Sequence, residues 1–388
     1  MAKDEAATVT LRLVGKLADV PAAAWNACAG DDNPFLRHEF LLALEESGSA
    51  SARTGWAPHH LVLDDADGRP VGCVPMYLKN HSQGEYVFDH GWADALERAG
   101  GRYYPKLQVA VPFTPVPGRR LLVRPDAPYE ATARTLLAGC LEVARQAEVS
   151  SLHLTFCTEA EWRLLGEAGL LQRTGEQFHW ESDGYRTFDD FLADLAARKR
   201  KAVKKERREA LENGIEVEVV SGAAITDKHW DAMFAFYQDT GGRKWGRPYL
   251  NRAFFHRLGQ VMPEQVVLIL ARRAGRYIAG ALNLKGSDTL YGRYWGCTEE
   301  HRFLHFELCY YQAIDYAIAH GLTRVEAGAQ GPHKLARGYR PKTTYSVHWI
   351  RDPGFRRAVA DYLARERAAV AREIEALDLH SPFRQETD

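Results

Sequence analysis

The chain has 388 residues, of which 46% are hydrophobic and 26% are charged, and its 50 basic and 51 acidic residues leave a net charge of -1. This length exceeds one ordinary core, so we expect two domains, and the composition is that of a globular protein. A balanced charge excludes a whole-protein field that attracts DNA or an anionic membrane, so any polyanion site has to be local.

Cysteine spacing and the lack of long apolar runs further limit which class of protein this chain can be. The six cysteines show no paired CxxC spacing, which argues against a zinc site or disulfide scaffold and favours a reducing compartment. No run approaches the ~20 apolar residues of a membrane span, and the amino terminus MAKDEAATVT has no signal-peptide core. We therefore predict a cytoplasmic protein without membrane insertion, metal or bound cofactor, and without DNA as a partner.

The first half alternates strands and helices. Its pattern predicts an opening strand within residues 8–20, a helix from Pro21 to Cys28, a hairpin over 59–80 turning at Asp67-Gly68, a helix from Tyr129 to Ala147, a strand over 150–157, a helix over 158–169 and a strand ending in QFHWE at Glu181. The aromatic, proline-rich stretch 86–117 is a loop that either walls a pocket or plugs the core; both readings stay open.

The second half repeats that order. A basic helix over 198–209 precedes a strand at 215–220, helices at Asp227–Asp239 and Tyr249–Leu258, and a hairpin turning at Ala274-Gly275. An aromatic strand follows, then an amphipathic helix with the stripe Phe303, Phe306, Tyr310, Ile314 and Ala317, closed by Gly321, and a strand from Thr323 to Ala327. We interpret the two halves as an internal structural repeat, with domains at 1–185 and 186–388.

The last two strands with their helix form a crossover unit. Such a connection makes the two strands parallel or close neighbours, so the polar loop after Ala327 leaves the carboxyl end of a strand. Open α/β sheets usually bind their ligands at that end.

The order of an aromatic strand, a helix ending AIAHGL, a strand ending EAGAQG and a basic glycine–aromatic run resembles the second domain of the Fem family of aminoacyl-tRNA-dependent enzymes, and more closely the FemAB-like N-acyltransferases. The resemblance covers most of the chain. It implies an α/β (α+β) fold of two tandem GCN5-related N-acetyltransferase-like domains, each a mixed central sheet flanked by helices. It also implies transfer of an aminoacyl or acyl group from aminoacyl-tRNA to a peptide or small-molecule amine, in cell-wall precursor or natural-product biosynthesis.

The basic helix RKRKAVKKERRE is the strongest charge feature. Charge alone leaves a solvated face and a phosphate-binding face about equally favoured. The family resemblance favours binding of a tRNA acceptor stem or a pyrophosphate-bearing substrate. The candidate donor contacts on this helix are Arg198, Lys201, Lys204, Lys205 and Arg208.

The polar loop supplies the candidate catalytic groups. Acyl transfer to an amine needs a proton acceptor and support for the oxyanion, and Glu326 or His333 could accept the proton while Gln330 offers an amide donor. Lys334 or Arg337 would stabilise the ester end of the donor, as the family's basic run implies. Three further candidates are His305, for which a capping role is the stronger expectation, and the strand aromatics Tyr294 and Trp295 as donor contacts.

The choice of acyl donor depends on an absent motif. Acetyl-CoA-dependent relatives carry a basic, glycine-rich turn before the long helix, where this chain has TEEHRFLHFE with Glu299 and Glu300. Negative charge there favours a donor other than CoA. The alternatives that remain are an acyl-CoA-dependent N-acetyltransferase and a non-catalytic RNA-binding protein.

Overall fold

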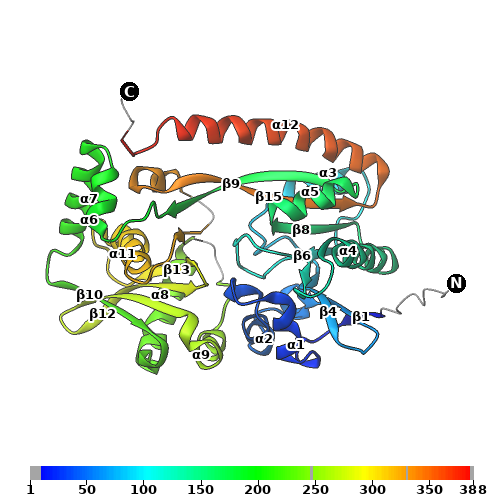
Figure 1. The fold of residues 1–388 in the computed structure, drawn as a ribbon, viewed down its shortest axis with the longest axis horizontal. Coiled ribbons are helices and arrows are strands. Elements are labelled where there is room, and N and C mark those ends of the chain that lie inside the picture. Colours follow the sequence, from blue (N-terminus) through cyan, green and yellow to red (C-terminus); the bar gives the residue numbers. More distant parts are fainter. Residues whose placement is uncertain (1–9, 245–247, 329–330, 385–388) are drawn as a thin grey trace. The chain divides into compact units, whose positions relative to one another are not determined.

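A computed structural model describes residues 10–244, 248–328 and 331–384 (Figure 1). The chain forms two compact units. Unit 1 comprises Met1–Gly175 and Thr344–Ala369, and unit 2 comprises Glu176–Thr343 and Val370–Asp388. Each unit has a mixed sheet flanked by helices, which confirms the predicted fold class. The proposed boundary between residues 185 and 186 stays a prediction.

Unit 1 holds two sheets. In strand order they are β1-β3-β4-β7 and β15-β8-β6-β5-β2. The strands are β1 (Thr10–Val14), β2 (Trp56–Pro58), β3 (His60–Asp64), β4 (Pro70–Val74), β5 (Met76–Lys79), β6 (Lys106–Val109), β7 (Leu122–Val123), β8 (Ser151–Cys157) and the end of β15 (Arg340–Ile350). The helices are α1 (Ala22–Ala29), α2 (His38–Glu46), α3 (His90–Arg98), α4 (Tyr129–Gln146), α5 (Glu159–Glu167) and the start of α12 (Pro353–Asp378).

Unit 2 is built around strands in the order β10-β11-β12-β13-β14-β9. These are β10 (Ile215–Ser221), β11 (Val266–Arg273), β12 (Arg276–Lys285), β13 (Thr289–Cys297), β14 (Arg324–Glu326) and the end of β9 (Leu171–Glu181). Its helices are α6 (Phe188–Asp194), α7 (Ala197–Ala210), α8 (Asp227–Lys244), α9 (Arg252–Val261), α10 (Leu304–Phe306) and α11 (Gln312–Ala319), with a π-helical turn at Glu307–Tyr311 and a 3-10 turn, η7, at Pro332–Arg337.

Each unit completes its sheet with a strand from the other half of the sequence. In unit 1, Tyr345–Ile350 of β15 pair antiparallel with β8. In unit 2, His179–Glu181 of β9 pair antiparallel with β14. The strand that ends in QFHWE was expected to complete the first domain, and the structure places this end in unit 2 instead. Hydrophobic periodicity identifies a strand but does not say which sheet receives it.

The organising crossover of unit 2 forms as the sequence predicts, with one difference in its helix. Strands β13 and β14 are parallel, and Gly321 has a φ of +67° just after α11, as a left-handed helix end requires. The helix does not begin at Phe303, whose φ is +62°, and it is interrupted by the π-helical turn. Tyr310, Ile314 and Ala317 of the expected stripe are buried in the core. The stripe is therefore largely correct, although it does not lie on one regular helix.

Candidate functional site

The site is centred on the end of β14 in unit 2. Parallel pairing joins Thr289–Tyr291 of β13 to Arg324–Glu326, and β13 then continues to Cys297 beyond the last residue of β14. Glu326 lies at the point where the two strands part and is only 5% exposed. Burial raises the pKa of its carboxyl group to about 8, and its Oε2 has no hydrogen-bond partner among the described residues. A buried carboxyl group of this pKa can accept or donate a proton near neutral pH.

His179, on the neighbouring strand β9, lies beside this carboxyl group. Its Nδ1 is 3.9 Å from Glu326 Oε1, within ion-pair distance if the ring were charged. Burial, helped by the nearby cations Arg324, Lys342 and Lys334, lowers the pKa of His179 to about 3. The ring is therefore neutral at physiological pH and does not hold Glu326 in its ionised form.

Lys334 lies in η7, the turn that follows β14. Its side chain is buried, and its Nζ donates a hydrogen bond to the carbonyl of Gly328 at 2.9 Å. Burial lowers the pKa of this ammonium group to about 8. Within the part of the chain that the structure describes, no carboxylate forms an ion pair with it. A buried amine without a counter-ion is suited to an anionic or strongly dipolar ligand group.

His305 and His333 meet in an aromatic group next to η7. The His333 Nε2 and the Tyr310 hydroxyl are 2.8 Å apart, and the rings of His305 and His333 have centroids 6.4 Å apart. Trp295 joins the group, with its ring 5.1 Å from that of His305. Tyr294 does not, because consecutive strand residues face opposite sides of a sheet. Its ring packs 5.1 Å from that of Tyr237 on α8.

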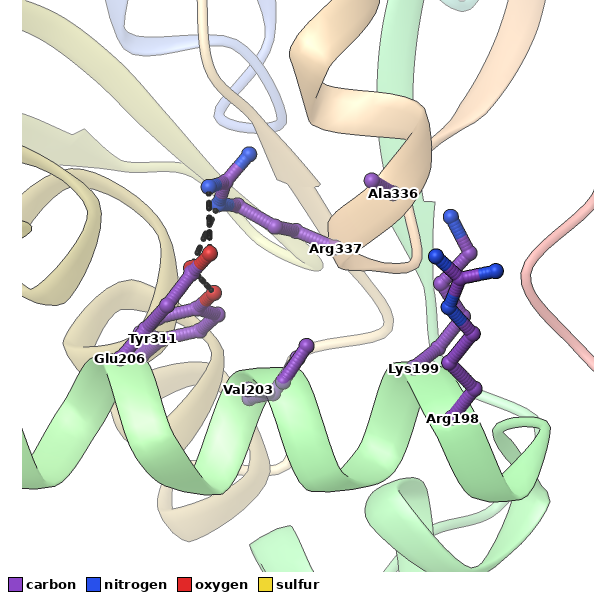
Figure 2. Close-up of a pocket in the computed structure, with 8 residues that line it drawn as sticks. Arg198, Lys199, Val203, Glu206, Tyr311, Ala336 and Arg337 are labelled. Carbon is purple, nitrogen blue, oxygen red and sulfur yellow. Dashed lines mark hydrogen bonds and ion pairs between the residues drawn. The ribbon is translucent and has the colours of Figure 1, made fainter.

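A pocket of about 350 Å³ opens between the basic helix α7 and η7 (Figure 2). Arg198 and Lys199 lie toward one end of α7, and Glu206 lies toward the other (Figure 2). Neither Arg198 nor Lys199 has an ion-pair partner within residues 10–244, 248–328 and 331–384. The pocket residues are Arg198, Lys199, Ala202, Val203, Glu206, Tyr311, Ala336 and Arg337.

Glu206 and Arg337 form the floor of this pocket as a two-point ion pair. The Arg337 Nε and Nη2 donate to the Glu206 carboxylate at 3.1 and 2.9 Å, and the Tyr311 hydroxyl also donates to it (Figure 2). The Arg337 guanidinium also lies 3.4 Å from the centroid of Phe306, a cation–π contact that links the pocket to the aromatic group. Because the charge of Arg337 is matched by Glu206, the cations available to a ligand are Arg198 and Lys199.

Arg207 joins α7 to the π-helical turn and to α11 through two further ion pairs. Arg207 Nη2 contacts Glu307 at 3.0 Å and Asp315 at 2.6 Å, and Gln312 donates to Glu307 at 2.7 Å. Glu307 is fully buried at the start of the π-helical turn. Turns of this kind are often found at functional sites. The basic helix thus has one fixed face and one face open to the pocket.

Of the five basic candidates on α7, one lines the pocket and four are exposed outside it. Arg198 lines the pocket, whereas Lys204 pairs with Asp189 at 3.3 Å and Lys205 pairs with Glu209 at 3.5 Å. Lys201 and Arg208 are exposed and do not line the pocket. Charge density alone could not separate the faces. The apolar pair Ala202 and Val203, one helical turn after Arg198 and Lys199, was the available signal for the inward face.

Lys199, Glu206 and Tyr311 were not selected as site residues from the sequence. Gln330, which was selected, lies outside the described residues. The structure also changes the reading of the turn before α10, because Glu299 pairs with Arg273 at 3.1 Å and with His301 at 3.3 Å. The negative charge of Glu299, one of the two that argued against CoA, is therefore matched by these neighbours.

The described residues contain no group of three or more His, Cys, Asp or Glu side chains arranged to hold a metal ion. None of the helices in that part of the chain is both long enough and apolar enough to cross a membrane.

Comparison with solved structures supports the fold. The chain superimposes on FemX with a TM-score of 0.56 and 13% identity, covering 90% of this chain and 100% of FemX. L-PGS from Bacillus licheniformis gives a TM-score of 0.50 and 10% identity, with 86% and 98% of the two chains covered. A conserved protein from Bacteroides thetaiotaomicron gives a TM-score of 0.52 at 11% identity, and the match covers 88% of this chain and 100% of that protein. At these identities the likeness concerns the fold alone.

Sequence comparison gives a more specific result. No curated protein matches the sequence. A family model described as peptidoglycan biosynthesis and recognition does match, and it extends over residues 16–385. Nearly the whole chain, including both units and every described candidate residue, lies within this match. The chain therefore belongs to the FemAB-like family.

Proposed function

We propose that the protein is an N-acyltransferase that joins an activated carboxyl group, carried as an aminoacyl ester on tRNA, to an amine acceptor in cell-wall or related biosynthesis. The observation that carries this proposal is Glu326, a buried carboxyl group with a pKa raised to about 8 at the parting of β13 and β14. Membership of a peptidoglycan biosynthesis and recognition family supports the reaction class.

In this mechanism the attacking amine has to be neutral. Glu326 in its ionised form takes a proton from the amine as the amine nitrogen attacks the ester carbonyl. The tetrahedral oxyanion then collapses, and the bond between the carbonyl carbon and the tRNA ribose oxygen breaks. The proton held by Glu326 then passes to that leaving oxygen. His333, exposed and within 2.8 Å of Tyr310, is the alternative proton acceptor.

The pocket beside α7 suits the anionic part of such a donor. Arg198 and Lys199 offer two uncommitted positive charges at its rim, and phosphate groups are bound by such side chains independently of nucleotide sequence. Lys334, buried in the same turn as Arg337, would support the ester end through its ammonium group.

An acyl-CoA donor is the second candidate, and one observation favours it. Because Glu299 is paired with Arg273 and His301, its charge opposes a pyrophosphate less than an unpaired carboxylate would. The two donors therefore have to be separated by experiment.

The test supplies purified protein with aminoacylated tRNA, uncharged tRNA or acetyl-CoA together with a panel of amines, and follows amide formation by mass spectrometry. We expect an amide product with aminoacylated tRNA alone. Product from acetyl-CoA, independent of tRNA, would replace the tRNA donor by CoA. Binding of tRNA with the ester left intact in the presence of every amine would favour an RNA-binding protein.

A further inference from the structure

The pocket beside α7 has a cationic rim and an electrically neutral floor. Arg198 and Lys199 line the rim from the first turn of the helix, whereas Glu206 and Arg337 form the floor as an ion pair (Figure 2). A simple anion is attracted by the rim cations but repelled by the Glu206 carboxylate. The pocket therefore fits a ligand with two unlike parts, an anionic group and an uncharged polar group.

The walls and the size of the pocket limit the uncharged part. Val203, on α7 between the rim and the floor, and Ala202 and Ala336 line it with small apolar groups (Figure 2). Glu206 lies about two helical turns after Lys199, roughly 11 Å along the helix axis. The volume of about 350 Å³ is near the lower end of the range for small-molecule sites, about 300–1,000 Å³. This separation and this volume suit one nucleotide, which has an uncharged base at one end and a phosphate at the other.

The floor keeps unused hydrogen-bonding capacity. Glu206 Oε2 accepts from Arg337 Nε and the Tyr311 hydroxyl, whereas Oε1 accepts from Arg337 Nη2 alone among the described residues. A carboxylate oxygen can accept two hydrogen bonds, so Oε1 can take one further donor. Within the described chain Arg337 uses three of its five N–H groups, for Glu206 and for the carbonyl of His333. The floor thus presents one acceptor beside spare donors.

This pattern distinguishes nucleobases by their edges. Cytosine and adenine carry an exocyclic amino group, which donates, next to a ring nitrogen that accepts, and carboxylates in proteins accept from the amino group of cytosine. Uracil has a carbonyl oxygen in place of the amino group. Against Glu206 it sets two acceptors face to face, and a buried acceptor left unpaired is costly.

An anchoring role for the floor does not account for the whole pocket. Arg207 already joins α7 to the π-helical turn and to α11 through Glu307 and Asp315. Anchoring also does not involve Arg198 or Lys199, which make no ion pair within the described residues and line the same pocket.

We propose that this pocket binds one unpaired nucleotide of the donor and selects bases that carry an exocyclic amino group. Arg198 and Lys199 contact the phosphate, the base lies between Val203 and Ala336, and its amino group donates to Glu206 Oε1. The inference rests on the proposed tRNA donor, whose unpaired 3′ end, CCA, has an amino group on every base. CoA also contains an adenine nucleotide, so the test has to include it.

Binding of uncharged RNA to the full chain tests the inference without a transfer reaction. The probes are the trinucleotides CCA and UUU, which carry equal phosphate charge, with CoA as a competitor, followed by titration calorimetry at one low salt concentration. We expect CCA to bind at least tenfold more tightly than UUU and to resist displacement by an equal concentration of CoA. Equal affinity for the two trinucleotides, or no binding of CCA, would overturn the inference. Displacement of CCA by equimolar CoA would overturn the assignment to RNA.

Three variants connect the preference to the floor. Glu206→Gln keeps the size of the side chain and adds an amide donor, so the preference for CCA over UUU should fall below about threefold. Arg198→Ala should weaken both trinucleotides equally and keep their ratio, because phosphate contacts do not read the base. Glu212→Gln, an exposed change just after α7, should alter neither affinity nor ratio. A partly unfolded Glu206→Gln lowers both affinities but not their ratio, so an unchanged ratio in this variant would contradict the assignment.

Failure of this inference can be told apart from failure of the proposed function. Amide formation from aminoacylated tRNA by a protein that does not discriminate CCA from UUU would keep the proposed function and remove the base-selective pocket. Discrimination between the trinucleotides without amide formation would do the reverse.

Discussion

The two units place their charged residues in opposite ways. In unit 1, Lys106 on β6 is buried together with Glu85 and Asp89, which precede α3. In unit 2, Arg198 and Lys199 line an open pocket, and Glu326 lies at the parting of two strands. Charges in a sealed cluster depend on one another, because each loses its solvation and relies on its partners. Charges around a pocket remain available to a ligand, so the two units should respond differently to the loss of a charge.

The largest effect is expected in the sealed cluster. Lys106→Met leaves Glu85 and Asp89 buried without their main counter-ion, and such a loss typically costs about 3–5 kcal/mol of unfolding free energy. Urea denaturation measures it. Lys204→Met is the matched control in unit 2, because Lys204 forms an exposed pair with Asp189 and should contribute about 0–1 kcal/mol. Similar costs for the two variants would remove the distinction between the units.

The second effect concerns catalysis at the parted strands. Glu326→Gln keeps the shape of the side chain and removes its proton chemistry, so kcat should fall by about 10²–10⁴-fold with little change in KM. Wild-type kcat should rise with pH toward about 8, the pKa of Glu326. Glu212→Gln, an exposed change just after α7, is the control and should be silent. If kcat is unchanged in Glu326→Gln, His333 becomes the proton acceptor.

The stability of the same variant separates catalysis from folding. The folded-state pKa of Glu326 is raised above its ordinary value of 4.5 to about 8, so the folded protein binds this proton more tightly than the unfolded chain. The wild type should therefore lose stability as pH rises through the window from 4.5 to 8. Glutamine is neutral throughout, so Glu326→Gln should lose less stability across that window, as thermal unfolding at several pH values would show.

The third effect concerns the two faces of α7. Replacing both Arg198 and Lys199 by alanine should weaken tRNA binding about tenfold or more and lower the salt slope by roughly 1.4 to 1.8, if each contacts one phosphate. Replacing Lys204 and Arg208, which do not line the pocket, should have a smaller effect. Titration with tRNA at several salt concentrations measures the affinity and the salt slope of each variant. Equal losses would mean that the whole helix, and not its pocket face, binds the donor.

Hydrophobic spacing reports local structure, so the sequence predicted most elements of both units. It missed α3 and β6, which lie within the stretch 86–117 that was expected to be a loop. The basic helix and the parallel crossover form. The hairpin at Asp67-Gly68 forms between β3 and β4, but its expected second strand divides at Pro75, and the end of it, β5, pairs with β6 in the other sheet. The sequence did not predict that β9 and β15 complete the sheets of opposite units, since a strand pattern carries no information about its partner. Nor did it select Glu206, whose role depends on Arg337, a residue 131 positions away.

The candidate site was also predicted only in part, because local order along the chain is predictable and contacts between distant segments are not. Glu326, His333, Lys334 and Arg337 follow one another on a strand and its loop, so their proximity could be read from chain order. Consecutive strand residues face opposite sides of a sheet, so the sequence could have shown that Tyr294 and Trp295 do not share a site. Both were nevertheless selected, and the structure places their rings in different groups. Buried ion pairs such as Arg207 with Glu307 join distant segments and were beyond the reach of spacing arguments.

The smallest effect should distinguish two neighbouring tyrosines of the π-helical turn. Tyr310→Phe removes the hydrogen bond to His333, a loss of about 0.5–1.5 kcal/mol, so turnover should fall less than about tenfold while donor affinity stays unchanged. Tyr311→Phe removes the hydrogen bond to Glu206 on the pocket floor, so donor affinity should change while turnover at saturation does not. Steady-state kinetics and binding on both variants give the comparison. If both tyrosines affect the same parameter, the aromatic group and the pocket act as one site, and the open charges of unit 2 are as interdependent as the sealed charges of unit 1.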